Sequence, residues 1–89
     1  MLIPVYSKQF SKDVKRIQKR RKSQNKLKVV IQKLVNGEQL NPIYKDHKLI
    51  GNYKGRRECH LEPNWLLIYK IRENEIIFER TGTHSDLFE

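Results

Sequence analysis

The spacing of apolar residues changes part-way along the chain, and this change restricts the fold more than any other feature. Between residues 8 and 35 apolar side chains recur every three or four positions, for example at Phe10, Val14 and Ile17, which predicts two helices. From residue 56 to residue 81 they alternate with polar residues or form short runs, which predicts strands. Helices that precede consecutive strands indicate an α+β fold, with a two-helix hairpin packed on one face of an antiparallel sheet.

Particular residues mark where these elements begin and end. Ser7 and Ser23 are typical N-cap residues, and Gly37 is typical of the position just after a helix. Residues 2–5 are β-prone, and Pro4 places that strand at an edge because proline cannot donate to a strand ladder. The predicted order is therefore β-α-α-β-β-β.

The last three predicted strands cover residues 56–61, 65–70 and 75–81, with turns at residues 62–64 and 72–74. Strict alternation would place Ile76, Phe78 and Arg80 together on one face of the last strand. Residues 38–55 have few periodic apolar positions, so we expect a long ordered loop, which contains His47.

Positive charge is concentrated in the first third of the chain. Residues 1–35 hold eleven Lys or Arg residues and one acid, Asp13, a net charge of +10. Residues 36–89 hold eight Lys or Arg residues and nine acids, a net charge of −1. This asymmetry favours a polyanion as partner, because contacts to phosphates release counterions. The alternative is a solvated helical surface that binds nothing.

Length and cysteine content exclude several classes of protein. A chain of 89 residues has room for one core, so we expect a single domain over residues 1–89. The one cysteine, Cys59, cannot form an intramolecular disulfide, and adjacent Cys59 and His60 would point to opposite faces of a strand, which disfavours a zinc site. We expect no metal and no cofactor. The chain shows no signal sequence and no membrane span, so we expect a cytoplasmic protein.

All three histidines, His47, His60 and His84, lie outside the basic helices. Cleavage of RNA by its own 2′-hydroxyl needs a base for the hydroxyl proton, an acid for the leaving oxygen and cations for the phosphate. Histidine suits both proton roles because its ordinary pKa is about 6.5. Each histidine has a candidate partner nearby in sequence: Asp46 for His47, Glu58 for His60 and Arg80 for His84.

These residues also have structural interpretations. A single histidine in a small domain is often a hydrogen-bonded surface or core residue. Arg80 suits bidentate phosphate binding, but it would also serve as a salt-bridge partner of Glu79 or Glu58. Trp65 and Phe88 suit either the apolar core or stacking on unpaired bases.

Four ordered segments form a more specific pattern. They are Tyr44-Lys45-Asp46-His47-Lys48-Leu49, Arg57-Glu58-Cys59-His60, Pro63-Asn64-Trp65-Leu66-Leu67-Ile68-Tyr69 and Arg80-Thr81-Gly82-Thr83-His84-Ser85-Asp86-Leu87-Phe88, with Gly51 after the first and shorter matches at residues 11–15 and 25–28. Together they resemble the YafQ branch of the RelE family of bacterial toxins, over almost the whole chain. The resemblance implies a RelE-like fold and an endoribonuclease that cuts mRNA in the ribosomal A site and so inhibits translation.

The resemblance also implies partners. A DinJ-like antitoxin with a ribbon-helix-helix DNA-binding part would neutralise the toxin, and operator DNA would be bound only by the toxin–antitoxin complex. The toxin itself would contact the ribosome and its message, with no membrane involved.

Carried over to this sequence, the family's functional residues are His47, His60, Trp65, Arg80, His84 and Phe88. His47 and His60 would share the roles of general base and transition-state stabilisation, and His84 would be the general acid. Arg80 would hold the scissile phosphate, and Trp65 and Phe88 would contact the message. The residues expected to bind ribosomal RNA are Lys8, Lys12, Lys15, Lys19, Arg20, Arg21, Lys22 and Lys26.

One position departs from the family pattern, since Asn64 stands where the resemblance leads us to expect Asp. An amide can orient a neighbouring group, but it cannot accept a proton or supply the charge that raises a histidine pKa. If that acid assists catalysis, this chain should bind normally and cut slowly.

Two other classes of function fit the basic composition. One is a noncatalytic module that binds RNA or DNA through the helices, and the other is an antitoxin-bound transcriptional co-repressor. Neither explains the combination of His47, His60, Arg80 and His84 with its flanking motif.

Overall fold

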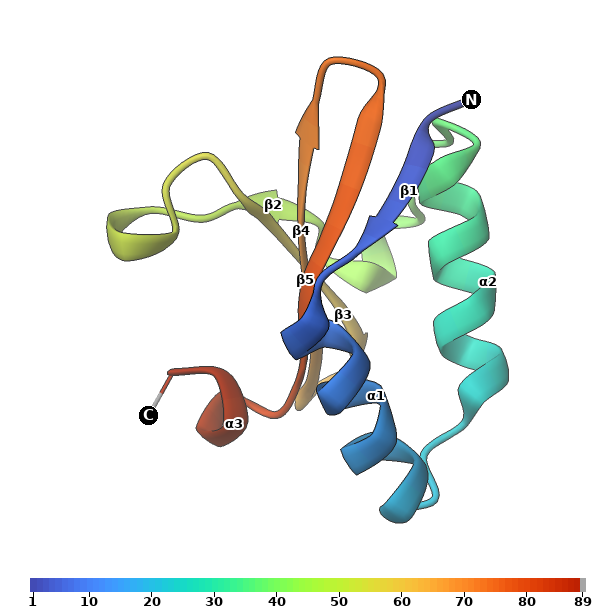
Figure 1. Ribbon diagram of the computed structural model, residues 1–89, viewed down its shortest axis with the longest axis vertical. Coiled ribbons are helices and arrows are strands. Elements are labelled where there is room, and N and C mark those ends of the chain that lie inside the picture. The colour runs from blue at the N-terminus through green and yellow to red at the C-terminus, as the bar shows by residue number, and fades with distance from the viewer. Residues whose placement is uncertain (89) are drawn as a thin grey trace.

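A computed structural model of the chain describes residues 1–88, which form one sheet with helices on both of its faces (Figure 1). The elements are β1 (Ile3–Tyr6), α1 (Lys8–Lys19), α2 (Gln24–Val35), β2 (His47–Lys48), β3 (Arg57–Glu62), β4 (Trp65–Arg72), β5 (Glu75–Gly82) and α3 (His84–Phe88). The predicted helices and the three long strands are confirmed. The stretch expected to be a loop also contains β2 and two single-turn 3-10 helices, Pro42–Tyr44 and Gly51–Tyr53. None of the described helices is long and apolar enough to cross a membrane.

Both long helices begin at the predicted caps. The hydroxyl of Ser7 accepts a hydrogen bond from the amide of Phe10, and that of Ser23 accepts one from Lys26. After α2 the chain turns at Gly37, whose φ of +75° is readily adopted by glycine. Local sequence therefore determines where these helices begin and where α2 ends.

The sheet has the strand order β1-β5-β4-β3-β2. Three of the neighbouring pairs are antiparallel, but β1 runs parallel to β5, so the sheet is mixed and the expectation of a wholly antiparallel sheet is corrected. The reason is topological, because the α1–α2 hairpin returns the chain to the far edge before the antiparallel strands form. Pro4 lies in the edge strand β1, as predicted.

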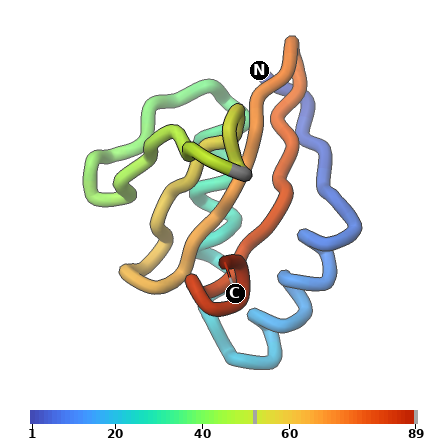
Figure 2. Tube along the Cα trace, turned by 90° about the vertical axis from the view of Figure 1, so that its left-hand side faces the viewer, coloured from blue at the N-terminus to red at the C-terminus, as the bar shows by residue number. Residues whose placement is uncertain are grey.

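The main core lies between the α1–α2 layer and one face of the sheet (Figure 1). Its central residues are Phe10 and Ile17 of α1 and Val30 of α2, packed against Leu67 and Phe78. A smaller cluster lies under α3 and consists of Leu66, Ile68 and Leu87, with Leu49 and Tyr53 beside it. Figure 2 views the molecule from this second side, with α3 and the segment around β2 facing the viewer.

A β-bulge in β5 changes which face Arg80 occupies. Tyr69 pairs with Phe78 and Ile68 pairs with Arg80, so Glu79 has no partner in β4. Cross-strand partners point to the same face, so Arg80 shares the face of Ile68 and not that of Phe78. The prediction that Ile76, Phe78 and Arg80 share one face is therefore wrong, because the extra residue reverses the alternation.

Beyond Phe78 the strand β5 forms the sheet edge, and a buried carboxylate of α1 meets it there. Asp13 has no exposed surface. Its Oδ2 accepts hydrogen bonds from Nε of Arg80 at 2.8 Å and from the amide of Thr81 at 3.1 Å. Its Oδ1 accepts hydrogen bonds from Nη2 of Arg80 at 3.3 Å and from Nε2 of Gln9 at 3.1 Å. These donors replace the water that the carboxylate loses on burial.

We expect Asp13→Ala to lower the free energy of unfolding by about 3–5 kcal/mol, because it leaves Nε of Arg80 and the buried Thr81 amide without their acceptor. Urea unfolding followed by circular dichroism measures this difference. The matched control is Lys12→Ala on the exposed side of α1, for which we expect a change within about 0.5 kcal/mol. Equal unfolding midpoints for the two variants would contradict the assignment.

Candidate active site

The fold brings together three histidines that are widely separated in sequence. The ring centroids of His47 and His60 are 6.1 Å apart, and those of His60 and His84 are also 6.1 Å apart. They come from β2, β3 and the start of α3, so two neighbouring strands of the sheet and the C-terminal helix supply the three rings. The face that carries them is the one opposite the α1–α2 layer.

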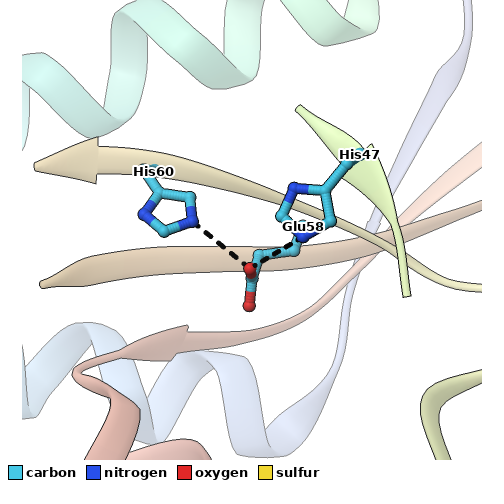
Figure 3. Close-up of side chains that lie close together, drawn as sticks. All are labelled: His47, Glu58 and His60. Atoms are coloured by element: carbon cyan, nitrogen blue, oxygen red, sulfur yellow. Dashed lines mark ion pairs between the residues drawn. The ribbon is translucent and has the colours of Figure 1, made fainter. Parts of the chain in front are cut away.

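Glu58 lies between the first two histidines (Figure 3). Its Oε2 is 3.2 Å from Nε2 of His47 and 3.3 Å from Nε2 of His60, and its side chain is 7% exposed. Glu58 is therefore the partner of His60, as predicted, and also of His47. Asp46 was the predicted partner of His47. Its Oδ1 instead accepts hydrogen bonds from Nε of Arg57 and from the hydroxyl of Tyr69.

The hydrogen bonds of His47 indicate how its protons are arranged. Its Nδ1 lies 2.6 Å from the carbonyl oxygen of Lys45, which can only accept, so Nδ1 carries a proton. Its Nε2 lies 3.2 Å from the carboxylate of Glu58. His60 needs only an Nε2 proton to pair with Glu58, which leaves its Nδ1 free to accept one.

Asn64 orients the third histidine. Its Oδ1 accepts a hydrogen bond from the backbone amide of His84 at 3.1 Å and lies 2.8 Å from Nδ1 of the same residue. Since the amide oxygen cannot donate, the Nδ1 of His84 carries the proton in this contact and its Nε2 is left for another partner. His84 is exposed at the start of α3, where it is accessible to a ligand.

Arg80 is held by Asp13, so neither structural partner expected for it, Glu79 or Glu58, is correct. Glu79 pairs with Arg56 instead, and Glu58 pairs with the histidines. The Nη2 of Arg80 also donates to the carbonyl oxygen of Asp86 at 3.4 Å. Hydrogen bonds from the guanidinium to Asp13 raise the pKa of Arg80, so it remains a cation. Its side chain is 23% exposed on the face of the histidines.

The two aromatic candidates lie in different environments. Trp65 is 1% exposed, and its Nε1 donates to Oγ1 of Thr81 at 3.0 Å, so it belongs to the core. The expectation that Trp65 contacts RNA is corrected, because a ring without exposed faces cannot stack on a base. Phe88 is 43% exposed, with its ring centroid 6.1 Å from that of His84, and it is available for stacking.

The basic residues expected to bind ribosomal RNA fall into two groups. Those that form no salt bridge with another described residue are Lys8, Lys12, Lys15, Lys19 and Arg21, and all of them are exposed. The other three are paired: Arg20 with Asp86, and Lys22 and Lys26 with Glu62. These two lysines hold the pKa of Glu62 below its usual range by hydrogen bonding to its carboxylate.

The geometry also allows a metal site that the sequence did not suggest. Single ligand atoms from His47, Glu58 and His60 lie within 4.8 Å of one another. Two imidazoles and a carboxylate are a donor set that zinc and copper accept. Cys59 takes no part, since it is fully buried on the opposite face, where burial raises the pKa of its thiol to about 12.

Asp13, and the contact of Glu58 with His47, are the structurally important features that the sequence did not identify. Glu58 stands two residues before His60 on the same strand face, which is a usable signal, but its contact with His47 requires the pairing of β2 with β3. Asp13 is the only acid among the first 35 residues, and nothing in the sequence connects it with Arg80, 67 positions away.

Comparison with known proteins places this geometry in a family. Residues 3–89 match the family described as a bacterial toxin of type II toxin-antitoxin system, YafQ. The chain belongs to the YafQ toxin family. It is 54% identical over 84 residues to the mRNA interferase toxin YafQ of Escherichia coli strain K12, an alignment that covers 93% of this chain and 91% of the relative. The resemblance to the YafQ branch is confirmed.

Solved structures of YafQ toxins and their relatives have the same fold. The crystal structure of YafQ from E. coli strain BL21(DE3) superposes with a TM-score of 0.95 at 49% identity, covering 100% of both chains. A chain of the E. coli DinJ–YafQ complex gives 0.93 at 50% identity, again over 100% of both chains. A metal-bound toxin from Helicobacter pylori gives 0.93 at 43% identity, over 99% of this chain and 100% of that one. The predicted fold class is therefore confirmed.

Proposed function

We propose that this chain, as one domain over residues 1–89, is a cytoplasmic endoribonuclease that cuts mRNA in the A site of the ribosome and so inhibits translation. The observation that carries the proposal is the row of three histidines on one face, with Arg80 on that same face. A base, an acid and a cation are the groups that internal cleavage of RNA requires. The E. coli relative is an mRNA interferase, which agrees with this chemistry.

The residues divide the reaction between them. His60 accepts the proton of the 2′-hydroxyl through its free Nδ1, while Glu58 holds its other nitrogen. The 2′-oxygen attacks phosphorus, and the bond from phosphorus to the 5′-oxygen breaks. His84 acts with both ring nitrogens protonated: Asn64 accepts from Nδ1, and the proton on Nε2 passes to the leaving oxygen. The products are a 5′-hydroxyl and a 2′,3′-cyclic phosphate. His47, as a hydrogen-bond donor, and Arg80 stabilise the charge that builds up on the phosphate.

The exposed lysines and arginines of α1 and of the turn after it supply the contact to ribosomal RNA. They lie on the helical layer, and the histidines lie on the other face of the sheet. This arrangement allows one face to bind the ribosome while the other meets the message. Phe88, beside His84, stacks on an unpaired base of that message.

A cognate antitoxin completes the system. The E. coli relative has been solved in complex with DinJ. By analogy, a DinJ-like ribbon-helix-helix antitoxin neutralises this toxin, and the complex binds operator DNA and represses its own operon. The toxin alone, without that partner, does not bind the operator specifically.

A second candidate property is metal binding by His47, Glu58 and His60. Their clustered ligand atoms and the metal-bound H. pylori relative support it. A bound ion would supply Lewis acidity, but it would also take the Nε2 atoms through which Glu58 holds His47 and His60 in place for the reaction. In this account a metal therefore inhibits, and the reaction needs none.

The first test is cleavage of a defined message on programmed ribosomes, with the 5′ ends mapped by primer extension. We expect cuts in the A-site codon, and we expect His84→Ala to slow them by roughly 100- to 10,000-fold because the leaving oxygen loses its acid. Arg72→Ala, in the far hairpin, is the control and should cut normally. Ribosome binding without any cuts, in this chain and in Asn64→Asp, would favour a noncatalytic binding module.

A second prediction concerns Asn64. A carboxylate at this position would keep the contacts to His84 and add a negative charge that stabilises the protonated ring. We expect Asn64→Asp to raise the single-turnover cleavage rate about tenfold and to move the alkaline limb of the pH–rate profile to higher pH. Identical rates and profiles for the two proteins would show that a charge at this position contributes nothing.

The basic helix face gives a third prediction. We expect Lys12→Glu combined with Lys15→Glu to weaken ribosome association and to flatten its dependence on salt, because fewer counterions are released. The matched control is Arg72→Glu, a charge reversal at the opposite end of the molecule, which should change affinity little. Unchanged affinity in the double variant would contradict the proposed contact.

Metal binding gives the fourth prediction. In calorimetry with Zn²⁺ we expect Glu58→Gln to weaken binding at least tenfold and His84→Ala to leave it unchanged, since only the first residue is a ligand. Equal loss in both variants, or no binding by the unmodified chain, would contradict the assigned ligands. A zinc-selective chelator, added with Mg²⁺ kept in excess for the ribosome, should not abolish cleavage.

A further inference from the structure

The α3 helix carries two residues of the site, but it is too short to hold them by itself. It spans five residues, His84–Phe88, and isolated helices of this length do not form in water. Its position therefore depends on contacts with the rest of the chain. Leu87 provides an apolar contact with Leu66 and Ile68, and the hydroxyl of Tyr53 donates to the carbonyl oxygen of Leu87 at 3.0 Å.

Asp86 makes the polar contacts that fix the orientation of this helix. Its Oδ2 accepts a hydrogen bond from the amide of Thr83 at 2.9 Å, and its own amide donates to Oγ1 of Thr83 at 3.2 Å. This reciprocal pair closes the turn on which His84 lies. The carbonyl oxygen of Asp86 also accepts from Arg80, so one residue connects the acid-bearing turn with the phosphate-binding cation.

The same carboxylate anchors the turn to α1. Nη1 and Nη2 of Arg20 donate to its two oxygens at 2.6 and 3.1 Å, and Nη1 of Arg16 lies 3.5 Å from Oδ1. A bidentate pair of this kind fixes direction as well as distance. The Asp86 side chain is only 13% exposed, and hydrogen bonding to Arg20 holds its pKa well below its usual range.

Gly82, at the end of β5, leaves room for the carboxylate of Asp86. A Cβ at Gly82 would lie 2.8 Å from Oδ2 of Asp86, which is closer than real Cβ atoms approach. Only glycine therefore allows the carboxylate to sit against the end of β5 in this geometry. Asn64 fixes the opposite side of the turn, through the amide and ring of His84.

We propose that Asp86 is a positioning residue for the reaction, which with Arg20 holds His84 and Phe88 in their working orientation. Neither residue touches the reacting atoms. Arg20, expected from the sequence to bind ribosomal RNA, acts mainly through Asp86. The inference rests on the proposed endonuclease function, and it adds that the basic helix determines the geometry of the catalytic turn.

The variant Asp86→Asn separates positioning from binding. It keeps the size of the side chain and an oxygen for Thr83, but it loses the charged pair with Arg20. Removing an acid from beside a basic surface should leave ribosome affinity unchanged or raise it. We expect the single-turnover cleavage rate at saturating ribosomes to fall about tenfold. The thermal midpoint should shift by less than about 8 °C, because the guanidinium of Arg20 is 42% exposed and water can replace the lost charge contact.

A double-mutant cycle supplies the specific readout. We expect Arg20→Ala to slow cleavage about tenfold in the unmodified chain, and to have little further effect in the Asp86→Asn background. Asp86→Glu, which restores the charge, should recover part of the rate. Arg72→Ala with Glu75→Gln breaks an ion pair at the far hairpin and should change nothing.

The outcomes distinguish a failure of the positioning role of Asp86 from a failure of the proposed endonuclease function. If the unmodified chain cuts and Asp86→Asn cuts at the same rate, the positioning role is wrong and the proposed function stands. The same conclusion follows if Arg20→Ala costs equal factors in both backgrounds. If neither the unmodified chain nor Asn64→Asp cuts on programmed ribosomes, the proposed function itself is wrong.

Discussion

The catalytic end of this molecule depends on two carboxylates that lie between α1 and the last strand. Asp13, fully buried, holds Arg80 and the amide of Thr81, and Asp86 connects Arg20 with the turn that carries His84. A small domain buries a thin apolar core. Charged contacts such as these therefore help to hold side chains and turns in one orientation that apolar packing alone would not determine. In the account proposed above, the exposed cations of the basic helix bind ribosomal RNA and Arg20 orients the site.

Features set by neighbouring residues could be predicted from the sequence. The caps at Ser7 and Ser23, the turn at Gly37 and the central strand that begins at Trp65 each follow from local spacing and backbone preference. The short helix α3 also has a local signal, since Thr83 and Asp86 have the spacing of a capping box. The histidines were recognisable as a set because of their types and flanking motifs.

Features set by distant contacts could not be predicted. The parallel pairing of β1 with β5 and the bulge at Glu79 depend on how strands meet in three dimensions. The bulge matters most for function, because it moves Arg80 onto the face of the histidines. Trp65 suited either the core or stacking on RNA by its residue type, and burial of the first five residues of β4 makes it a core residue.

The most direct test of the central claim concerns the nucleophile. If the histidines activate the message's own 2′-hydroxyl, a programmed ribosome carrying a single 2′-deoxy nucleotide at the mapped cleavage position should be bound normally and not cut. An all-ribose message should give fragments that end in a 2′,3′-cyclic phosphate, as resolved by mass spectrometry. Cleavage of the 2′-deoxy message at an unchanged rate would contradict the account, because the attacking oxygen would then come from elsewhere.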